Sequence, residues 1–285
     1  MQTRVWRDSR EVIIGHDRPT VLIGERINPT GKKKLAAALM AGDMEIVRRE
    51  ALAQVQAGAD ILDVNVGLVG VDEVALLPRA VSAVMEAVDV PLCLDSHNTK
   101  ALEAALQIHR GKAIVNSVTG REESLREILP LIKEYGAAVI GLTVDDQGIP
   151  RDADRRLAIA YRIIERAEAI GIAREDVIID CLILTIGSDN NAGAVALEAV
   201  SRVKSELGVN QTLGASNVSY GLPDREILNG TFLTLAIAAG VTCPTVDVAK
   251  VRPFVLSTDL VLARDKFAQR YIRAYRQRQA TLRGS

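Results

Sequence analysis

The runs DILDVN (Asp60–Asn65), PLCLD (Pro91–Asp95) and AIVN (Ala113–Asn116) decide the fold, because each is a short apolar segment that ends in a polar residue. Five further runs of this kind occur, and the ends of successive runs lie 21 to 37 residues apart. A strand–helix–strand unit needs about 30 residues, and all but the shortest interval contain a helical pattern. Eight such units predict a single closed (β/α)8 barrel, a TIM barrel of the α/β class.

The polar residues that end these runs are the first candidates for a functional site. In a barrel of this kind the carboxyl ends of the strands converge on one face, where active sites are built. The runs themselves are nearly continuous and apolar, which is typical of parallel strands covered on both faces. The eight ends are Asn28, Asn65, Asp95, Asn116, Thr143, Asp180, Asn217 and Asp247.

Length and composition favour one domain. The 285 residues are 48% hydrophobic and 25% charged, an ordinary globular composition, and only 3% are aromatic, so we expect an aliphatic core. The chain shows no Pro-rich linker or change of composition. We therefore assign residues 21–285 to the barrel, and residues 1–20 to an N-terminal extension that closes the barrel bottom or contacts a neighbouring chain.

Charge and cysteine content exclude several classes of function. The net charge of −1 offers no basic field for nucleic acid or for an anionic membrane surface. We interpret the basic tail, residues 270–283, as a terminal helix or an oligomer contact. Three scattered cysteines without paired spacing predict buried thiols in a reducing compartment. The N-terminus has no long apolar run, so we expect a cytoplasmic protein without a signal peptide or membrane span.

Capping residues divide the chain between the strands into helices. Thr99, Asp152 and Asp224 are the expected N-caps, and Gly58, Gly136 and Gly208 are the expected helix ends. The predicted helices cover residues 35–57, 71–87, 99–109, 122–135, 152–171, 192–207 and 224–240, and a last helix starts near Pro253.

The strand ends lack the usual catalytic groups. No cluster of His, Cys and carboxylate has metal-ligand spacing, so we predict no protein-bound metal, and no Ser–His–Asp set or Schiff-base lysine is visible. Only His97, close after Asp95, is placed to reach the site. Amides and carboxylates remain, and together they offer fixed donors and acceptors for a flat amino-pyrimidinone edge. Each of them alone is better explained as a turn or cap residue. As a set, Asp95, Asn116, Asp180 and Asn217 favour a binding site.

The same runs resemble a known family. Matching segments occur in the same order along the chain, namely IGERIN (Ile23–Asn28), LDVNVG (Leu62–Gly67), LCLDS (Leu92–Ser96), IVNS (Ile114–Ser117), IGLT (Ile140–Thr143), IDCLIL (Ile179–Leu184), GASNVS (Gly214–Ser219) and NGTFL (Asn229–Leu233). They resemble the methyltetrahydrofolate:corrinoid methyltransferases of the pterin-binding barrel superfamily, which include the folate domain of cobalamin-dependent methionine synthase. The resemblance runs from about residue 21 to 264. It implies methyl transfer, in either direction, between 5-methyltetrahydrofolate and the cobalt of a cobalamin (corrinoid) cofactor.

The resemblance also implies roles for particular residues. Asp95, Asn116 and Asp180 would bind the pterin edge, with Asp95 or Asn116 holding a water that relays a proton. Asn217 would approach folate N5 as a mobile amide. Cys181 departs from the family pattern, which often has proline there, and this changes the local backbone stiffness only. Further lining residues would be Asn65, Ser96, Gly214 and Ser216, with Arg225 at the p-aminobenzoyl-glutamate tail.

Partners follow from what the chain lacks. It carries no cobalamin-binding Asp-x-His-x-x-Gly signature, so a separate corrinoid protein would present the cofactor at the open barrel face. The family further implies a homodimer, and an O-demethylase pathway is among the possible sources of the methyl group.

Three alternative functions remain open. A dihydropteroate synthase-like enzyme is disfavoured, because Ser216-Asn217-Val218 stands where that family has an Arg-Lys pair for the leaving diphosphate. A non-catalytic folate-binding barrel would bind the folate without transferring the methyl group. An interaction protein with a decayed site is disfavoured by the intact set of four polar residues.

Overall fold

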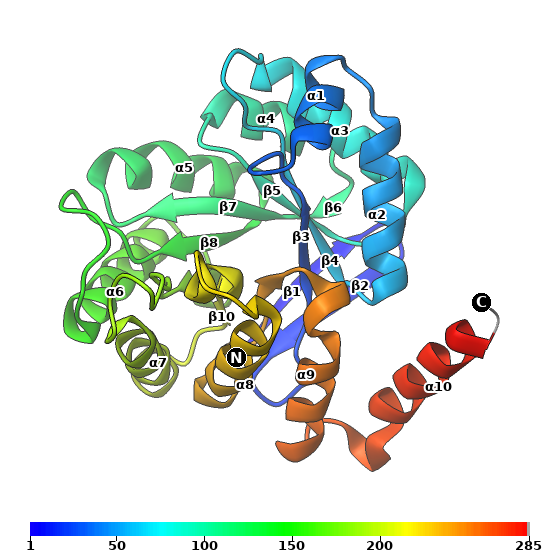
Figure 1. The fold of residues 1–285 in the computed structure, drawn as a ribbon. Helices are drawn as coiled ribbons and strands as arrows, with labels where there is room; N and C mark the ends of the chain where they lie inside the picture. The colour runs from blue at the N-terminus through cyan, green and yellow to red at the C-terminus, as the bar shows by residue number, and fades with distance from the viewer. Residues whose placement is uncertain (284–285) are drawn as a thin grey trace.

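Eight parallel strands form one sheet in the computed structural model, which describes residues 1–283 (Figure 1). Gly284 and Ser285, part of the predicted barrel domain, lie outside the described residues. The strands follow the order β10-β9-β8-β7-β5-β4-β3-β11 around the sheet. Their bounds are β3 Ile23–Ile27, β4 Ile61–Asn65, β5 Leu92–Asp95, β7 Ile114–Thr119, β8 Ala138–Leu142, β9 Val177–Asp180, β10 Gln211–Thr212 and β11 Thr245–Val246.

The two end strands close this sheet into a barrel. Gly214 and Thr245 form a parallel bridge, and the N–H of Thr245 donates to the carbonyl of Leu213 at 3.1 Å. The hydroxyls of Thr212 and Thr245 lie 3.1 Å apart across the same seam. The predicted (β/α)8 barrel is therefore confirmed.

A small antiparallel sheet covers the N-terminal end of the barrel. It consists of β1 (Gln2–Arg7), β2 (Arg10–Gly15) and β6 (Gly111–Lys112). Asn210, directly before β10, donates from its amide to Thr3 Oγ1 at 2.9 Å and to the carbonyl of Ile14 at 3.1 Å. Val5 and Ile14 join the apolar cluster of the barrel interior, which leaves the opposite end for the site.

Helices surround the barrel, and aliphatic side chains of several of them pack against its strands. Helix α10 instead extends away from the barrel beyond α9 (Figure 1). Helix α5 ends at Gly136 with a φ of 60°, as predicted from the sequence. Asp152 caps α6 by accepting from the N–H of Arg155 at 2.8 Å, also as predicted. The helices are α1 Lys33–Met40, α2 Glu45–Ala57, α3 Glu73–Ala87, α4 Thr99–Ile108, α5 Glu122–Tyr135, α6 Ala153–Ala169, α7 Ala192–Arg202, α8 Arg225–Ala239, α9 Val248–Val261 and α10 Gln269–Arg283.

Two predicted N-caps are wrong. Asn98, not Thr99, caps α4, because its Oδ1 accepts from the N–H of Lys100 at 3.0 Å. Asp224 precedes α8 with a φ of 47°, and its side chain accepts no capping hydrogen bond. In both cases the residue type was suitable, but the backbone turn decided which side chain faces the free N–H groups.

Two predicted helix boundaries are also wrong. The helix predicted for residues 35–57 is two helices, because Gly42 takes a φ of 69° and Asp43 Oδ1 accepts from the N–H of Glu45 at 2.9 Å. The last predicted helix starts at Val248, and Pro253 lies inside it. The prediction for residues 192–207 is confirmed, because a π-helical segment continues α7 from Val203 to Leu207 and Gly208 follows it with a φ of 67°.

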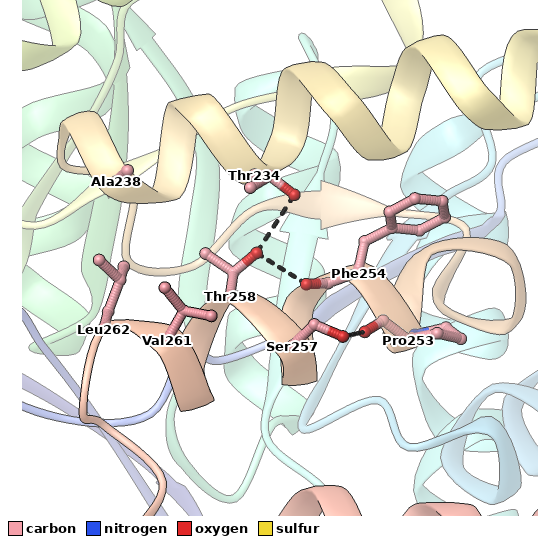
Figure 2. A pocket seen from close by; sticks show the side chains of 8 residues that line it. All are labelled: Thr234, Ala238, Pro253, Phe254, Ser257, Thr258, Val261 and Leu262. Carbon is pink, nitrogen blue, oxygen red and sulfur yellow. Dashed lines mark hydrogen bonds between the residues drawn. The ribbon is translucent and has the colours of Figure 1, made fainter.

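The outer surface carries an apolar cavity of about 360 Å³ between α8 and α9. Figure 2 shows Thr234 and Ala238 on α8 at one side of it, and Phe254, Val261 and Leu262 from α9 and its end at the other. The side chain of Val261 is 84% exposed. The cavity has no titratable side chain in its lining, so it is a surface for packing rather than for chemistry.

Candidate active site

Three adjacent strands place their last polar residues at one level of the barrel. Asn65 on β4 is the register partner of Asp95 on β5, and Asp95 is the partner of Asn116 on β7. Register partners in a parallel sheet point to the same face. The structure therefore brings together three of the predicted residues, and we call Asn65, Asp95 and Asn116 the polar layer.

A fourth polar residue, the carboxylate Asp63, lies one layer below and was missed from the sequence. Asp63 precedes Asn65 by two residues, so both side chains point to the same face of β4. Asp63 is only 2% exposed, and the amide of Asn116 donates to its Oδ1 at 3.3 Å. The prediction considered only the ends of runs. An aspartate inside the apolar run Ile61–Val64 was the signal that was available.

The two aspartates of β4 and β5 share one electrostatic environment. Burial raises the pKa of Asp63 well above its ordinary value, and the charge of Asp95 adds to this. Burial also raises the pKa of Asp95, against a hydrogen bond from Asn65 that lowers it. Ionising both carboxyl groups is unfavourable, because two negative charges would then lie close together in a buried site. The two groups therefore titrate as a pair. The pair therefore retains a proton to higher pH than an exposed aspartate does.

Asp180 ends β9, two strands beyond β7 in the sheet. Its Oδ1 accepts from the N–H of Leu182 at 2.7 Å, and the N–H of Gly214 is a second donor. Burial raises its pKa to about 7 in spite of these donors. Near neutral pH this carboxyl group is therefore divided between its charged and neutral forms.

Asn217 does not end a strand, in contrast to the prediction from the sequence. Strand β10 stops at Thr212, and Asn217 lies in the 3-10 segment Ala215–Ser219. A Cβ atom on Gly214 would lie 3.4 Å from its Nδ2, so the glycine leaves room for the amide. Asn217 is exposed, and its side chain has no hydrogen-bond partner within the described part of the chain. The amide is therefore free to contact a ligand.

Glu25 is a second residue that sequence reasoning missed. It lies on β3, its Oε1 accepts from the hydroxyl of Ser216 at 2.8 Å, and burial raises its pKa. Only the end of the run, Asn28, had been considered there. Glu25 and Ser216 line a cavity of about 310 Å³ together with Arg225 and Lys250. This cavity extends the site toward the N-terminus of α8.

Two predicted residues contact other groups than the polar layer. The hydroxyl of Ser96 donates to Glu73 Oε2 at 2.6 Å and accepts from the N–H of Asn98 at 3.0 Å. Arg225 donates to the hydroxyl of Ser219 at 3.0 Å and to the carbonyl of Ser216 at 2.8 Å. Ser96 thus ties β5 to α3, and Arg225 ties α8 to the segment that carries Asn217.

The thiols of the chain are poor candidates for a nucleophile. Cys93, Cys181 and Cys243 are all buried, and burial raises the pKa of each thiol, so none is a ready thiolate. Residues 1–283 contain no group of three or more His, Cys, Asp and Glu side chains arranged to hold a metal ion. Within the same residues, no helix is long and apolar enough to cross a membrane. The described groups can bind a polar heterocycle, hold a proton and donate an amide hydrogen bond.

Several known proteins are similar to this chain in sequence or in fold. Residues 24–247 match the family model of the pterin binding enzymes. Methylcorrinoid:tetrahydrofolate methyltransferase of Eubacterium limosum is 28% identical over 267 residues, which cover 90% of this chain and 96% of that one. Methionine synthase of Mycobacterium tuberculosis is 33% identical over 250 residues, covering 83% of this chain and 21% of that protein. Dihydropteroate synthase of Clostridium difficile gives a TM-score of 0.70 at 22% identity, covering 86% of this chain and 97% of that one.

The chain belongs to the pterin-binding enzyme family. Within that family it is methyltransferase-like, with distant homology to a methylcorrinoid:tetrahydrofolate methyltransferase over nearly its whole length. It spans about a fifth of the methionine synthase that it matches. The resemblance inferred from the sequence is thereby confirmed, whereas the similarity to dihydropteroate synthase concerns the fold alone.

Proposed function

We propose that this protein transfers a methyl group between 5-methyltetrahydrofolate and the cobalt of a corrinoid carried by a separate protein. The observation that carries the proposal is the coincidence of a polar layer suited to a pterin with thiols that are all buried and unreactive. A reduced corrinoid brings its own nucleophile, the Co(I) electron pair, so the barrel needs only to bind and orient the folate. The 28% identity over nearly the whole chain supports the same assignment.

The pterin edge would be held by carboxylates and amides. In this proposal Asp95 and Asp180 accept from the ring N–H and the exocyclic amine, and Asn116 donates to the ring carbonyl. Asn65, Gly214 and Ser216 line the pocket. Because Asp180 is half protonated near pH 7, folate binding should release a proton from it.

The methyl transfer itself needs a proton at N5. The Co(I) electron pair forms the Co–C bond, and the electron pair of the N5–C bond remains on N5, where it takes up a proton. The free amide of Asn217 donates a hydrogen bond to N5 and strengthens this contact as the bond breaks. The pair of Asp63 and Asp95, which retains a proton, is the proposed proton reservoir. Asp63 is thereby added to the residues predicted from the sequence.

The folate tail would leave the barrel toward the cavity below α8. Arg225 and Lys250 line it together with Glu25, Glu226 and Asp247, and Lys250 pairs with Asp247 at 3.7 Å. Arg225 is therefore the proposed partner of the glutamate carboxylate. Arg225 also holds the segment that carries Asn217. Tail binding and the position of the amide are therefore linked through one side chain.

The corrinoid protein would approach the open carboxyl end of the barrel. Three apolar side chains stand exposed on segments around this end: Val69 after β4, and Tyr220 and Ile227 near the N-terminus of α8. Tyr220 is 70% exposed and Ile227 is 64% exposed. Exposed apolar residues at the rim of a site suit a transient protein contact.

The predicted homodimer has its best support in the outer helices. The apolar cavity between α8 and α9 is flanked by the exposed Val261 and Leu262 (Figure 2). A second copy of the chain would cover this surface. Sedimentation of the wild type and of Val261→Asp tests this, because a dimer through this face should dissociate in the variant.

The role of Asn217 tests the proposed chemistry. Asn217→Ala removes one donor to the transition state, and loss of one such donor costs about 100-fold or more in rate. We expect single-turnover methyl transfer to cob(I)alamin to slow by that factor, while the folate dissociation constant changes by less than about threefold. Asn191→Ala, an exposed amide at the start of α7, is the matched control. Equal losses in binding and rate would reject the transition-state role of Asn217.

A further inference from the structure

Arg156 on α6 is the largest of the almost fully buried side chains, with 1% exposure. A buried cation is ordinarily paired with a carboxylate, because its desolvation is costly. In residues 1–283 no carboxylate oxygen lies within ion-pair distance of this guanidinium, and its hydrogen bonds go to backbone carbonyls. The acceptors are Pro150 O at 2.9 Å, Cys181 O at 3.1 Å and Leu182 O at 2.9 Å.

Two of these carbonyls belong to the turn that follows Asp180. Leu182 has a φ of 60°, in the left-handed region that leucine rarely adopts. In this conformation its N–H donates to Asp180 Oδ1 at 2.7 Å. On the other side of the turn, Thr143 donates from its N–H to the carbonyl of Asp180 at 3.0 Å. The guanidinium therefore holds a backbone turn whose shape fixes one oxygen of the Asp180 carboxylate.

The charge of Arg156 acts on the same carboxylate. Its positive charge lowers the pKa of Asp180, against the larger effect of burial, which raises it to about 7. The other charged or titratable groups that face the guanidinium are Cys181, Asp152 before α6 and Asp189 before α7. Among these groups Asp180 is the one that ends a barrel strand. A guanidinium held by backbone carbonyls thus supports an acid that must become charged.

We propose that Arg156 is a positioning residue for Asp180, clamping the strand-end turn so that this carboxylate is aimed and ionised to accept the pterin edge. The functional purpose of this arrangement rests on the proposed folate binding. The coupling between Arg156 and Asp180 does not depend on that proposal. It assigns a role to a residue far from the strand ends in sequence. It also gives a reason why a guanidinium is buried among backbone carbonyls in spite of the cost of its desolvation.

The decisive experiment first measures the coupling without folate. The unfolding free energy of the wild-type chain is compared with that of Asp180→Asn between pH 5 and 9. The same comparison is then made between Arg156→Met and the double variant Arg156→Met/Asp180→Asn. The pH at which their difference levels off reports the titration of Asp180. We expect this point to move upward in Arg156→Met, because the positive charge that lowers the pKa of Asp180 is removed. Arg155→Met is the matched control, since Arg155 is half-exposed and pairs with Asp145, and it should leave the titration in place.

The second measurement is the folate dissociation constant at pH 6, 7 and 8. Arg156→Met should weaken binding at pH 7, and less so at pH 8, because the ionised fraction of Asp180 falls when its pKa rises. Arg156→Lys keeps the charge but not the full set of hydrogen bonds. It should therefore leave the titration point in place and weaken binding at every pH. In an Asp180→Asn chain, Arg156→Met should cause no further loss of affinity.

The outcomes separate the two proposals. An unmoved titration point in Arg156→Met, or an equal loss of affinity with and without Asp180, would show a merely structural arginine and overturn the inference. If Arg156→Met does not fold, Arg156→Lys decides, because unchanged affinity in that variant overturns the positioning role. A wild-type chain that binds no folate would refute the proposed function, while the folate-free titration would still decide the coupling.

Discussion

Replacing Asp180 by asparagine should change the pH dependence of stability in a defined direction. The pKa of this carboxyl group is about 7 in the folded chain, because burial penalises its charged form. In an unfolded chain an aspartate titrates near 4. The folded state thus binds the proton more tightly than the unfolded state does. The unfolding free energy therefore falls as the pH rises from about 4 to about 7, and this contribution is constant above.

The size of the effect follows from the same shift. Each pKa unit corresponds to about 1.4 kcal/mol, so the full window removes up to about 4 kcal/mol from the wild type. The asparagine of the Asp180→Asn chain does not titrate, and it keeps an oxygen for the N–H of Leu182. We expect Asp180→Asn to be nearly neutral at pH 4 to 5 and to become the more stable chain by about 3 to 4 kcal/mol at pH 8.

Urea unfolding followed by circular dichroism at several pH values measures this difference. Other buried acids, including Glu25 and Asp63, titrate in both chains, so they cancel in the comparison. Asp146→Asn, at an exposed position, is the control for the substitution itself. Parallel stability curves for the wild type and Asp180→Asn between pH 5 and 8 would refute the raised pKa of Asp180.

Three further expectations concern the proton reservoir and the packing of the late helices. Asp63→Asn should lower the rate of methyl transfer at neutral pH about tenfold or more with little change in folate affinity; an unchanged rate–pH profile in stopped-flow transfer would remove Asp63 from the mechanism. Gly230→Ala places a Cβ atom 2.5 Å from the ring of Phe254, so thermal unfolding should show a loss of about 1 to 3 kcal/mol, and an unaltered melting temperature would contradict the tight α8–α9 contact. Asp259 is fully buried and accepts from the N–H and hydroxyl of Thr20 at 2.9 and 2.7 Å. Asp259→Ala should therefore cost about 3 to 5 kcal/mol in urea unfolding, and a cost below about 1 kcal/mol would show that this network is not stabilising.

The barrel was predictable because its signal is local and repeated. Each strand is a short apolar run, each helix has its own apolar period, and the interval between units is set by the crossover. The same locality explains why Asn65, Asp95 and Asn116 were each identified as the end of a strand run. Residues at equivalent places in adjacent units lie at one level of the barrel, so their proximity can be predicted without knowing any tertiary contact.

The missed residues needed information that the runs do not carry. Asp63 and Glu25 lie inside their strands, so an expectation limited to strand ends passed over them, although the alternation of side chains would have placed Asp63 on the same face as Asn65. The position of Asn217 depends on the short β10 and the 3-10 segment after it. Two hydrogen bonds of Arg156 reach Cys181 and Leu182, which lie 25 and 26 positions further along the chain. No sequence pattern indicates these hydrogen bonds.

Transfer of an isotopically labelled methyl group from 5-methyltetrahydrofolate to cob(I)alamin tests the central proposal most directly. The purified chain is mixed with both substrates without oxygen, and the decay of the cob(I)alamin absorbance is followed together with the label. We expect stoichiometric methylcobalamin and tetrahydrofolate, with free cob(I)alamin or with a corrinoid protein as acceptor. Tight folate binding without transfer to either acceptor would contradict it, and would leave a folate-binding barrel that performs no methyl transfer.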